Sequence, residues 1–351
     1  MSTRQRLLLV LLAFAALYVI WGSTYLAMKV AIAELPPLLM AGSRFVVAGG
    51  ILLGCLAAFG RVRASDLLRP LHWRSAFLIG GGLMLFGNAF VALSLARVPT
   101  GVAALMVATT PMWLVGLDWL SGRSGRPAPQ VILGIFVGLG GIGVLSGVLT
   151  PGAGLDVDPW GVLGLLLATL GWAVGSIYSR HAPLPKSILV ATAMEMLAGG
   201  VLVLLLGACL EDWSGFTPAN ASWSAYAAWG YLIVFGSLIG FTAYLWLLRE
   251  VSAAKVATYA YVNPIVAVWL GWGYLGEPVG VRTFVAAGLI LAAVLLINLY
   301  RRPPKDAPAT EPVASIDAPA AEEQVLEEEH HAAEVHSSRG TEPTSVNPTT
   351  R

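Results

Sequence analysis

Charged residues are scarce over most of this 351-residue chain. Asp, Glu, Lys and Arg make up 12% of it, whereas soluble domains contain about 25%. Ten of the twenty acids follow residue 305, and hydrophobic residues account for 57% of the chain. This deficit excludes a soluble globular domain for residues 1–300 and predicts that they lie in a lipid bilayer.

Cysteine and histidine, which serve most metal sites and many catalytic ones, are also few. The two cysteines, Cys55 and Cys209, both lie in apolar runs, which excludes a disulfide framework and predicts that they pack inside the protein. The five histidines all fall in expected loops or near the C-terminus. Neither a phosphate-binding glycine loop of the Walker type nor a catalytic constellation is present. We therefore predict no enzyme activity, no cofactor, no metal site and no drive by ATP.

Long apolar runs are abundant instead, each about as long as the roughly 20 residues that cross a bilayer as a helix. They lie near 7–28, 36–59, 75–96, 100–120, 130–149, 160–179, 188–209, 224–248, 254–275 and 281–300. The first run is too long for a signal peptide and leads into further runs, so it is expected to be retained. The predicted fold class is an all-α integral membrane protein with ten transmembrane helices.

Loop charge predicts the orientation of these helices, because cytoplasmic loops are enriched in Lys and Arg. With the N-terminus inside, fifteen basic residues lie in inside loops and three in outside loops (inside: Arg4, Arg6, Arg61, Arg63, Arg69, Arg74, Arg123, Arg126, Arg180, Lys186, Arg249, Lys255, Arg301, Arg302 and Lys305; outside: Lys29, Arg97 and Arg282). Both termini are therefore predicted to be cytoplasmic. Since the basic residues are spread over many loops, a nucleic-acid partner is not predicted.

Two stretches of the same design, Val98–Pro111 and Val251–Pro264, indicate an internal duplication. Each starts with Val after a charged residue, reaches its proline after the same spacing, and continues as a tryptophan-containing apolar run. Trp21–Lys29 and Trp172–Arg180 are likewise matched in spacing. If each copy contains five helices, an odd number, the second copy must enter the membrane from the side opposite to the first. This is the arrangement of secondary transporters with inverted repeats.

The predicted domains follow from this duplication. Residues 7–149 and 160–300 are expected to form two inverted five-helix repeats, with a substrate site near the membrane midplane at their interface. Residues 303–351 are rich in Pro, Ala, Glu, Ser and Thr. Such a segment cannot bury enough apolar surface to fold, so a disordered acidic cytoplasmic tail is predicted.

Several stretches are similar to those of a known family. They are Trp21–Ala27 (WGSTYLA), Pro36–Phe45 (PPLLMAGSRF), Phe235–Phe241 (FGSLIGF), Ala257–Pro264 (ATYAYVNP) and Gly276–Pro278 (GEP). Together they resemble the EamA-type drug/metabolite transporters, and among them the YedA-like inner-membrane permeases, over about residues 10–300. The resemblance implies a ten-helix bundle whose central path serves metabolite or amino-acid efflux. In one departure, Leu120–Arg123 lacks the Gly-Glu found at Gly276–Glu277, so Glu277 is predicted to cap a helix end.

Polar residues deep inside an apolar run are costly to bury and therefore mark candidate sites. Arg44 in the second predicted helix and Glu195 in the seventh should both approach the midplane. They are expected either to form a charge pair or to contact the carboxylate and amine of a zwitterionic substrate. The alternatives are that Arg44 snorkels or bonds backbone carbonyls, and that Glu195 is a neutral structural acid. Asn88, midway along the third helix, is expected to bond either a substrate or a neighbouring helix.

Aromatic residues and prolines complete the candidate substrate path. Trp21 and Trp172 lie too deep for the interfacial aromatic belt, so they are expected to line a cavity or, alternatively, to pack; Tyr244 is a further candidate of this kind. Pro111 and Pro264 are predicted hinges, because a proline frees a backbone carbonyl. The polar groups just before them should either satisfy those carbonyls or line the path (Thr110, Tyr261 and Asn263).

These features predict a secondary transporter, a permease that exports small organic metabolites, amino acids among them, by alternating access. Proton coupling would use Glu195, the only carboxylate expected at mid-membrane, and facilitated diffusion is the alternative. Two other functions stay open: export of lipophilic drugs or lipid-linked substrates, and a membrane scaffold that recruits a partner through the acidic tail. The predicted partners are a small-molecule substrate, the bilayer and protons, and no oligomeric state is predicted.

Overall fold

The computed structural model describes residues 3–122, 126–146, 157–180, 182–251, 256 and 258–300. All regular secondary structure within these residues is helical. The acidic tail predicted for residues 303–351 lies outside the described residues. The described residues belong to one compact unit.

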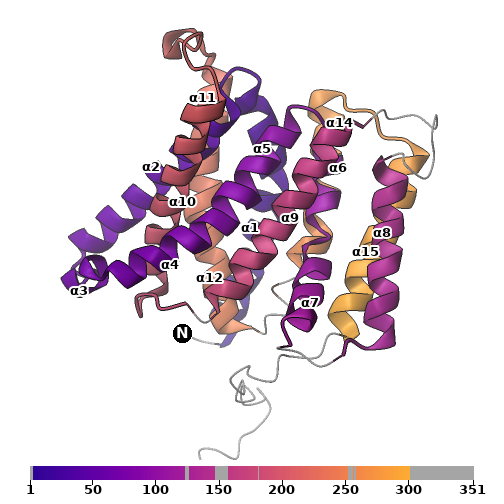
Figure 1. The fold of residues 1–351 in the computed structure, drawn as a ribbon, viewed down its shortest axis with the longest axis horizontal. Helices are drawn as coiled ribbons and strands as arrows, with labels where there is room; N and C mark the ends of the chain where they lie inside the picture. Colours follow the sequence, from indigo (N-terminus) through magenta and orange to yellow (C-terminus); the bar gives the residue numbers. More distant parts are fainter. Residues whose placement is uncertain are drawn as a thin grey trace, which may run out of the picture. The chain divides into compact units, whose positions relative to one another are not determined.

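The helices lie side by side and run between two opposite ends of this unit (Figure 1). The N-terminal half comprises α1 (Thr3–Ile32), α2 (Pro37–Ala58), α3 (Ala64–Leu68), α4 (Pro70–Gly80), η1 (Gly81–Ala89), α5 (Phe90–Leu95), α6 (Thr100–Val107), α7 (Thr110–Leu120) and α8 (Pro129–Ser146). The C-terminal half comprises α9 (Pro159–Ser179), α10 (Ile188–Leu210), η2 (Pro218–Asn220), α11 (Trp223–Tyr231), η3 (Leu232–Ile239), α12 (Gly240–Glu250), α14 (Tyr259–Leu275) and α15 (Val281–Tyr300). We call the end with the connections 33–36, 96–99, 211–222 and 276–280 the upper end, and the end where α7 and α9 finish the lower end.

Eight helical segments of the described chain are long and apolar enough to cross a membrane. They coincide with eight of the ten predicted runs. The other two runs, the fifth and the ninth, contain α8 and α14, whose apolar helices are shorter. The structure thus supports a multi-span all-helical protein, with eight helices of full spanning length.

Two local predictions were wrong, and the fourth run is less regular than predicted. It is one spanning segment, Thr100–Leu120, in which α6 ends at Val107 and α7 begins at Thr110, with Pro111 in its first turn, where a proline is well tolerated. His72 is not in a loop but in α4, buried. Cys55 and Cys209 are exposed rather than packed, because in a membrane protein the outward helix face is as apolar as the inward one.

The predicted spans near 75–96 and 224–248 each contain a π-helical stretch, η1 and η3 respectively. The two stretches overlap when one half of the chain is shifted by the 153 positions that separate Pro111 from Pro264. π-helical turns are rare, and they occur frequently at functional sites. Their recurrence at matched places agrees with a duplicated unit.

The two halves pack against each other crosswise. α1 contacts α11, η3, α12 and α14 of the C-terminal half, while α9 contacts α4, η1, α5, α6 and α7 of the N-terminal half. The most extensive pairs are α2 with α10 and α8 with α15. Small residues allow the closest approaches between helices. A Cβ added to Gly80 would lie 2.6 Å from the backbone nitrogen of Gly199, so only glycine fits there. Close packing of this kind holds membrane helices together.

Four of the helices that begin at the upper end receive a carboxylate at their N-terminus: α2 from Glu211, α6 from Glu277, α9 from Asp158 and α11 from Glu34. A carboxylate there satisfies amide groups that lack a helical partner and faces the positive end of the helix dipole. The hydroxyl and then the backbone N–H of Ser222 lower the pKa of Glu34 by hydrogen bonding.

Candidate functional site

Arg44 lies about a third of the way along α2, with only 5% of its surface exposed. Its Nη2 donates to Asn88 Oδ1 at 2.7 Å, and its Cζ lies 4.3 Å from the centre of the Phe45 ring. Among the described residues, its Nε and Nη1 have no hydrogen-bond partner. A guanidinium carries five N–H groups, and Asn88 takes one of them. The other N–H groups, those of Nε and Nη1 among them, are therefore open to an acceptor such as a carboxylate.

Asn88 is positioned by η1 so that its amide oxygen faces Arg44. Its Nδ2 donates to the backbone oxygen of Leu83 at 3.0 Å, which fixes the orientation of the amide. Asn88 thus forms the helix–helix hydrogen bond that the sequence offered as one alternative. The same bond holds the Arg44 side chain in place.

Glu195 lies away from Arg44, so the predicted charge pair between them is not formed. α2 and α10 pack antiparallel: Gly49 lies beside Ala193 and Leu197, and Gly200 lies beside Gly42 and Val46. Glu195 is therefore level with about residue 49 of α2. Arg44 lies about five residues from that level, or about 7.5 Å along the helix axis. Within the described part of the chain, the Glu195 carboxylate has no hydrogen-bond or ion-pair partner.

Trp21 is the centre of an aromatic group where α1, α12 and α14 meet. Its ring centroid lies 5.0 Å from that of Tyr259 and 5.4 Å from those of Tyr244 and Phe241. Its Nε1 donates to the backbone oxygen of Gly236 at 3.2 Å. Edge contacts with neighbouring rings and a bonded N–H hold the indole in one orientation.

Trp172 occupies the matched place in the other half of the chain. It lies against Gly87 of η1, where an added Cβ would come within 2.7 Å of the ring. Gly240, which is 153 positions after Gly87, has the same relation to Trp21. Each tryptophan therefore packs on the π-helical region of the opposite half.

The polar groups beside the prolines satisfy backbone carbonyls. Thr110 Oγ1 donates to the backbone oxygen of Val107 at 2.6 Å, so it closes the break between α6 and α7, as one alternative predicted. Asn263 is 8% exposed. With its amide nitrogen turned toward them, it donates to the carbonyls of Tyr18 and Tyr259 at 3.2 Å each.

The two predicted hinges differ in structure. Pro111 directly follows the break between α6 and α7, so the backbone already changes direction there. Pro264 lies inside α14, which continues on both sides of it. The side chain of Tyr261 lies outside the described residues.

A cluster of polar contacts at the upper end was not assembled by sequence reasoning. Both oxygens of Glu277 accept from Thr100 N at 2.9 Å, and Oε2 also accepts from Thr100 Oγ1 at 2.7 Å. The prediction that Glu277 caps a helix end is confirmed, and the helix is α6. Lys29 of α1 donates to the carbonyls of Leu95 and Val98 at the end of α5 and lies within electrostatic range of Glu277. The α5–α6 turn is thus held from both sides.

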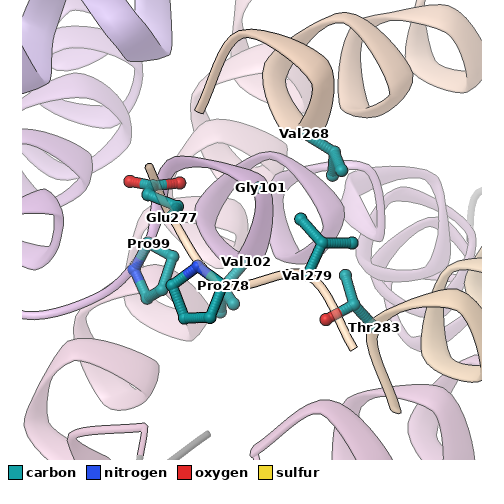
Figure 2. A pocket seen from close by; sticks show the side chains of 8 residues that line it. All are labelled: Pro99, Gly101, Val102, Val268, Glu277, Pro278, Val279 and Thr283. Carbon is teal, nitrogen blue, oxygen red and sulfur yellow. The ribbon is translucent and has the colours of Figure 1, made fainter. Parts of the chain in front are cut away.

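The chain turns so that Glu277 reaches α6. Gly276 ends α14 with φ 65°, a left-handed conformation that favours glycine. Beside the carboxylate is a cavity of about 10 Å³ between α6, α14 and α15, lined by Val102, Pro278 and Thr283 among others (Figure 2). The buried Thr283 hydroxyl has no partner among the described residues, and the volume is about that of one water molecule.

A second charged contact lies at the lower end. Arg180, directly after α9, donates through Nη1 to both carboxylate oxygens of Asp118 at 3.2 and 3.1 Å. Asp118 belongs to α7 and is 3% exposed. The pair therefore connects the two halves of the chain at the end opposite to Glu277.

One sequence signal pointed to these two clusters. The matched spacings of Trp21–Lys29 and Trp172–Arg180 place one basic residue at each end of the bundle. Their partners come from elements far away in sequence. No spacing rule could therefore identify those partners.

Known proteins place this geometry in context. Residues 7–147 and 159–299 each match the EamA-like transporter family. The "Uncharacterized inner membrane transporter YedA" of Escherichia coli (strain K12) is 41% identical over 290 residues, which cover 82% of this chain and 90% of that protein. The "Uncharacterized transporter YvbV" of Bacillus subtilis (strain 168) is 27% identical, covering 87% and 95%. A crystal structure at 22% identity, covering 83% of this chain and 96% of the other, superposes with a TM-score of 0.55 and so shares the fold. This chain belongs to the EamA-like transporter family.

Proposed function

We propose that this chain is a permease that exports small organic metabolites bearing a carboxylate, amino acids among them, across the inner membrane by alternating access. The observation that carries the proposal is the set of open N–H groups of Arg44, which is buried about a third of the way along α2. A buried guanidinium without a full set of acceptors is costly. A substrate carboxylate would supply the missing acceptors in the bidentate geometry that arginine favours.

The chain is a multi-pass inner-membrane protein of a transporter family. We further propose ten spans in two inverted repeats, with α8 and α14 completing the set of eight longer helices. The 153-position match of Gly87 with Gly240 and of Pro111 with Pro264 supports the duplication, as does the crosswise packing of α1 and α9. Loop charge supports placing both termini and the lower end in the cytoplasm.

The proposed substrate path passes between two groups of side chains. Arg44 and Asn88 form its polar wall, where the carboxylate binds. The ring cluster around Trp21, with Tyr244 and Tyr259, forms an apolar wall on α1, α12 and α14. Aromatic walls also suit lipophilic molecules, so an exporter of lipophilic drugs is the second candidate function.

Counterflow in proteoliposomes separates the two candidates. The purified protein is reconstituted, loaded with an unlabelled amino acid, and exposed to trace labelled amino acid outside; a lipophilic cation is tested in parallel. We expect protein-dependent accumulation of at least one carboxylate-bearing amino acid, because the Arg44 guanidinium pairs with an anion. Accumulation of the cation alone would contradict the proposal and favour the second candidate. Empty liposomes are the control.

Energy coupling is tested at Glu195. We propose that this unpartnered mid-helix carboxylate takes up the proton that is exchanged for the substrate. An imposed pH gradient should accelerate transport by the wild type, whereas Glu195→Gln should transport at the same rate with and without the gradient. The measurement is initial transport rate in proteoliposomes of set internal and external pH. A wild type that ignores the gradient would establish facilitated diffusion instead.

A further inference from the structure

The Glu277 cluster joins elements of both halves at the upper end. Lys29 extends from α1 to the last carbonyls of α5, and Glu277 extends from the α14–α15 connection to the first amide of α6. The Thr100 hydroxyl, whose one proton bonds Glu277 Oε2 at 2.7 Å, also lies 3.3 Å from the backbone oxygen of Ala267 in α14 and shares that proton with it. Separating α6 from α14 at this end would break each of the contacts of Thr100 to Glu277 and Ala267.

The Asp118–Arg180 pair likewise joins elements of both halves at the lower end. Asp118 is fixed in α7 of the N-terminal half, and Arg180 follows α9 of the C-terminal half. Both carboxylate oxygens are within 3.2 Å of the same Nη1. Separating α7 from α9 would leave a buried carboxylate without this partner, which is costly.

The duplication relates the two clusters to each other. A shift of 151 positions takes Trp21 to Trp172 and Lys29 to Arg180, so the basic residues correspond. The two acidic residues, Asp118 and Glu277, do not correspond in this way. The shift of 153 positions that takes Pro111 to Pro264 takes Asp118 to position 271, which is a glycine.

The space beside Gly271 explains why the acid comes from position 277 in the C-terminal half. A Cβ added there would overlap Glu277 Oε2 and Thr100 Oγ1. The missing side chain thus leaves the room that the Glu277 carboxylate fills. In the N-terminal half, Asp118 supplies a carboxylate from the helix itself. In the C-terminal half, the following turn supplies it, because Gly276 directs Glu277 back over the helix.

From this correspondence we infer that Glu277 and Asp118 are counterpart gate residues, each of which closes one end of the substrate path. The inference rests on the proposed alternating access. When the path opens upward, the contacts of Glu277 to Thr100 break while the Asp118–Arg180 pair persists. When it opens downward, the reverse occurs. Removing one carboxylate therefore biases the transporter toward opening at that end only.

Accessibility of a buried reporter cysteine tests this inference. Thr109 is fully buried in the break between α6 and α7, between the two ends, and Thr109→Cys is made in a background with Cys55→Ser and Cys209→Ser. Labelling by a membrane-impermeant maleimide is measured in vesicles of either orientation. Ser224→Cys at the upper end and Ser65→Cys at the lower end, both exposed, report which face the reagent reaches.

Opposite shifts are expected from the two gates. Glu277→Ala should raise labelling of the reporter from the upper end about tenfold, and Asp118→Asn should raise it from the lower end by a similar factor, since each loses charged hydrogen bonds. Arg180→Gln is the second variant at the lower end. It keeps Asp118 and should give the same shift if Asp118→Asn does not fold.

Moving the carboxylate gives the sharpest test. Combining Gly271→Asp with Glu277→Ala and Thr100→Ala places the acid where Asp118 stands in the other half and removes both side-chain oxygens that the new Cβ would overlap. The backbone N–H of residue 100 stays available to the new carboxylate, and labelling from the upper end should return toward the wild-type rate. Gly273→Asp with Glu277→Ala and Thr100→Ala is the matched control, because the space beside Gly273 is open, and it should stay at the raised rate. Equal behaviour of the two triple variants would overturn the correspondence.

The outcomes separate this inference from the proposed function. Counterflow by the wild type, with labelling unchanged in the single variants or raised from both ends, overturns the gates and leaves the permease standing. Opposite labelling shifts without counterflow of any amino acid support the gates and contradict the proposed substrate class.

Discussion

Replacing Arg44 by methionine should lower the rate of amino-acid counterflow about 100-fold, the loss that follows from removing two charged hydrogen bonds to a carboxylate. The protein should still fold and insert. Methionine fills most of the same volume, and the change removes the unpartnered Nε and Nη1 groups from the interior. We therefore expect a thermal unfolding temperature equal to or above that of the wild type, measured on purified protein in detergent.

Two further variants make this result specific. Arg44→Lys keeps the charge but loses the planar fork, so it should recover only part of the rate. Arg61→Met removes an exposed arginine of the α2–α3 connection and should transport at the wild-type rate. Wild-type counterflow by Arg44→Met would remove Arg44 from the substrate path and with it the main support for a carboxylate substrate.

Gly80→Ala should cause a large loss of stability although it adds only one methyl group to the bundle. The new Cβ would lie 2.6 Å from the nitrogen and 2.7 Å from the Cα of Gly199, and 2.9 Å from the backbone oxygen of Glu195. All three atoms belong to backbone, so α4 and α10 must separate to make room. Overpacking of this kind costs about 1–3 kcal/mol and sometimes more.

Gly81→Ala is the matched control for this prediction. Its new Cβ would meet nothing closer than Leu202 Cδ1 at 3.7 Å, and alanine is favoured over glycine in a helix by about 1 kcal/mol. It should therefore unfold at the wild-type temperature or slightly above, while Gly80→Ala unfolds well below it. The fraction of protein that stays monodisperse after heating measures both. Equal curves for the two variants would show that α4 and α10 are not packed this closely.

The sequence predicted the features of this fold that depend on composition and repetition. Apolar runs mark the helices because lipid demands apolar surface all round, and the paired prolines and tryptophans reveal the duplication. A capping role for Glu277 was also predicted, but not that the capped helix is α6, whose first residue lies 177 positions away. These signals are local, or recur at a fixed spacing.

The partner of each polar group could not be predicted in the same way. Arg44 bonds to Asn88 rather than Glu195 because of the rotation and register of α2 against its neighbours, which hydropathy does not encode. Thr100 lies 177 positions from the carboxylate that it binds. Which helix faces point inward was hidden as well, since lipid-facing and core-facing side chains are equally apolar, and the two cysteines were misplaced for this reason.

The crosswise packing of α1 has a consequence for the order of folding during synthesis. The backbone acceptor for Trp21 lies 215 positions later in the chain, and most of the surface that α1 contacts belongs to α11, η3, α12 and α14. At typical synthesis rates, roughly 10 to 40 s separate the emergence of Trp21 from that of its acceptor. During that interval α1 has only lipid and the N-terminal helices as neighbours. The first half of this protein therefore reaches its final packing only after most of the second half has been made.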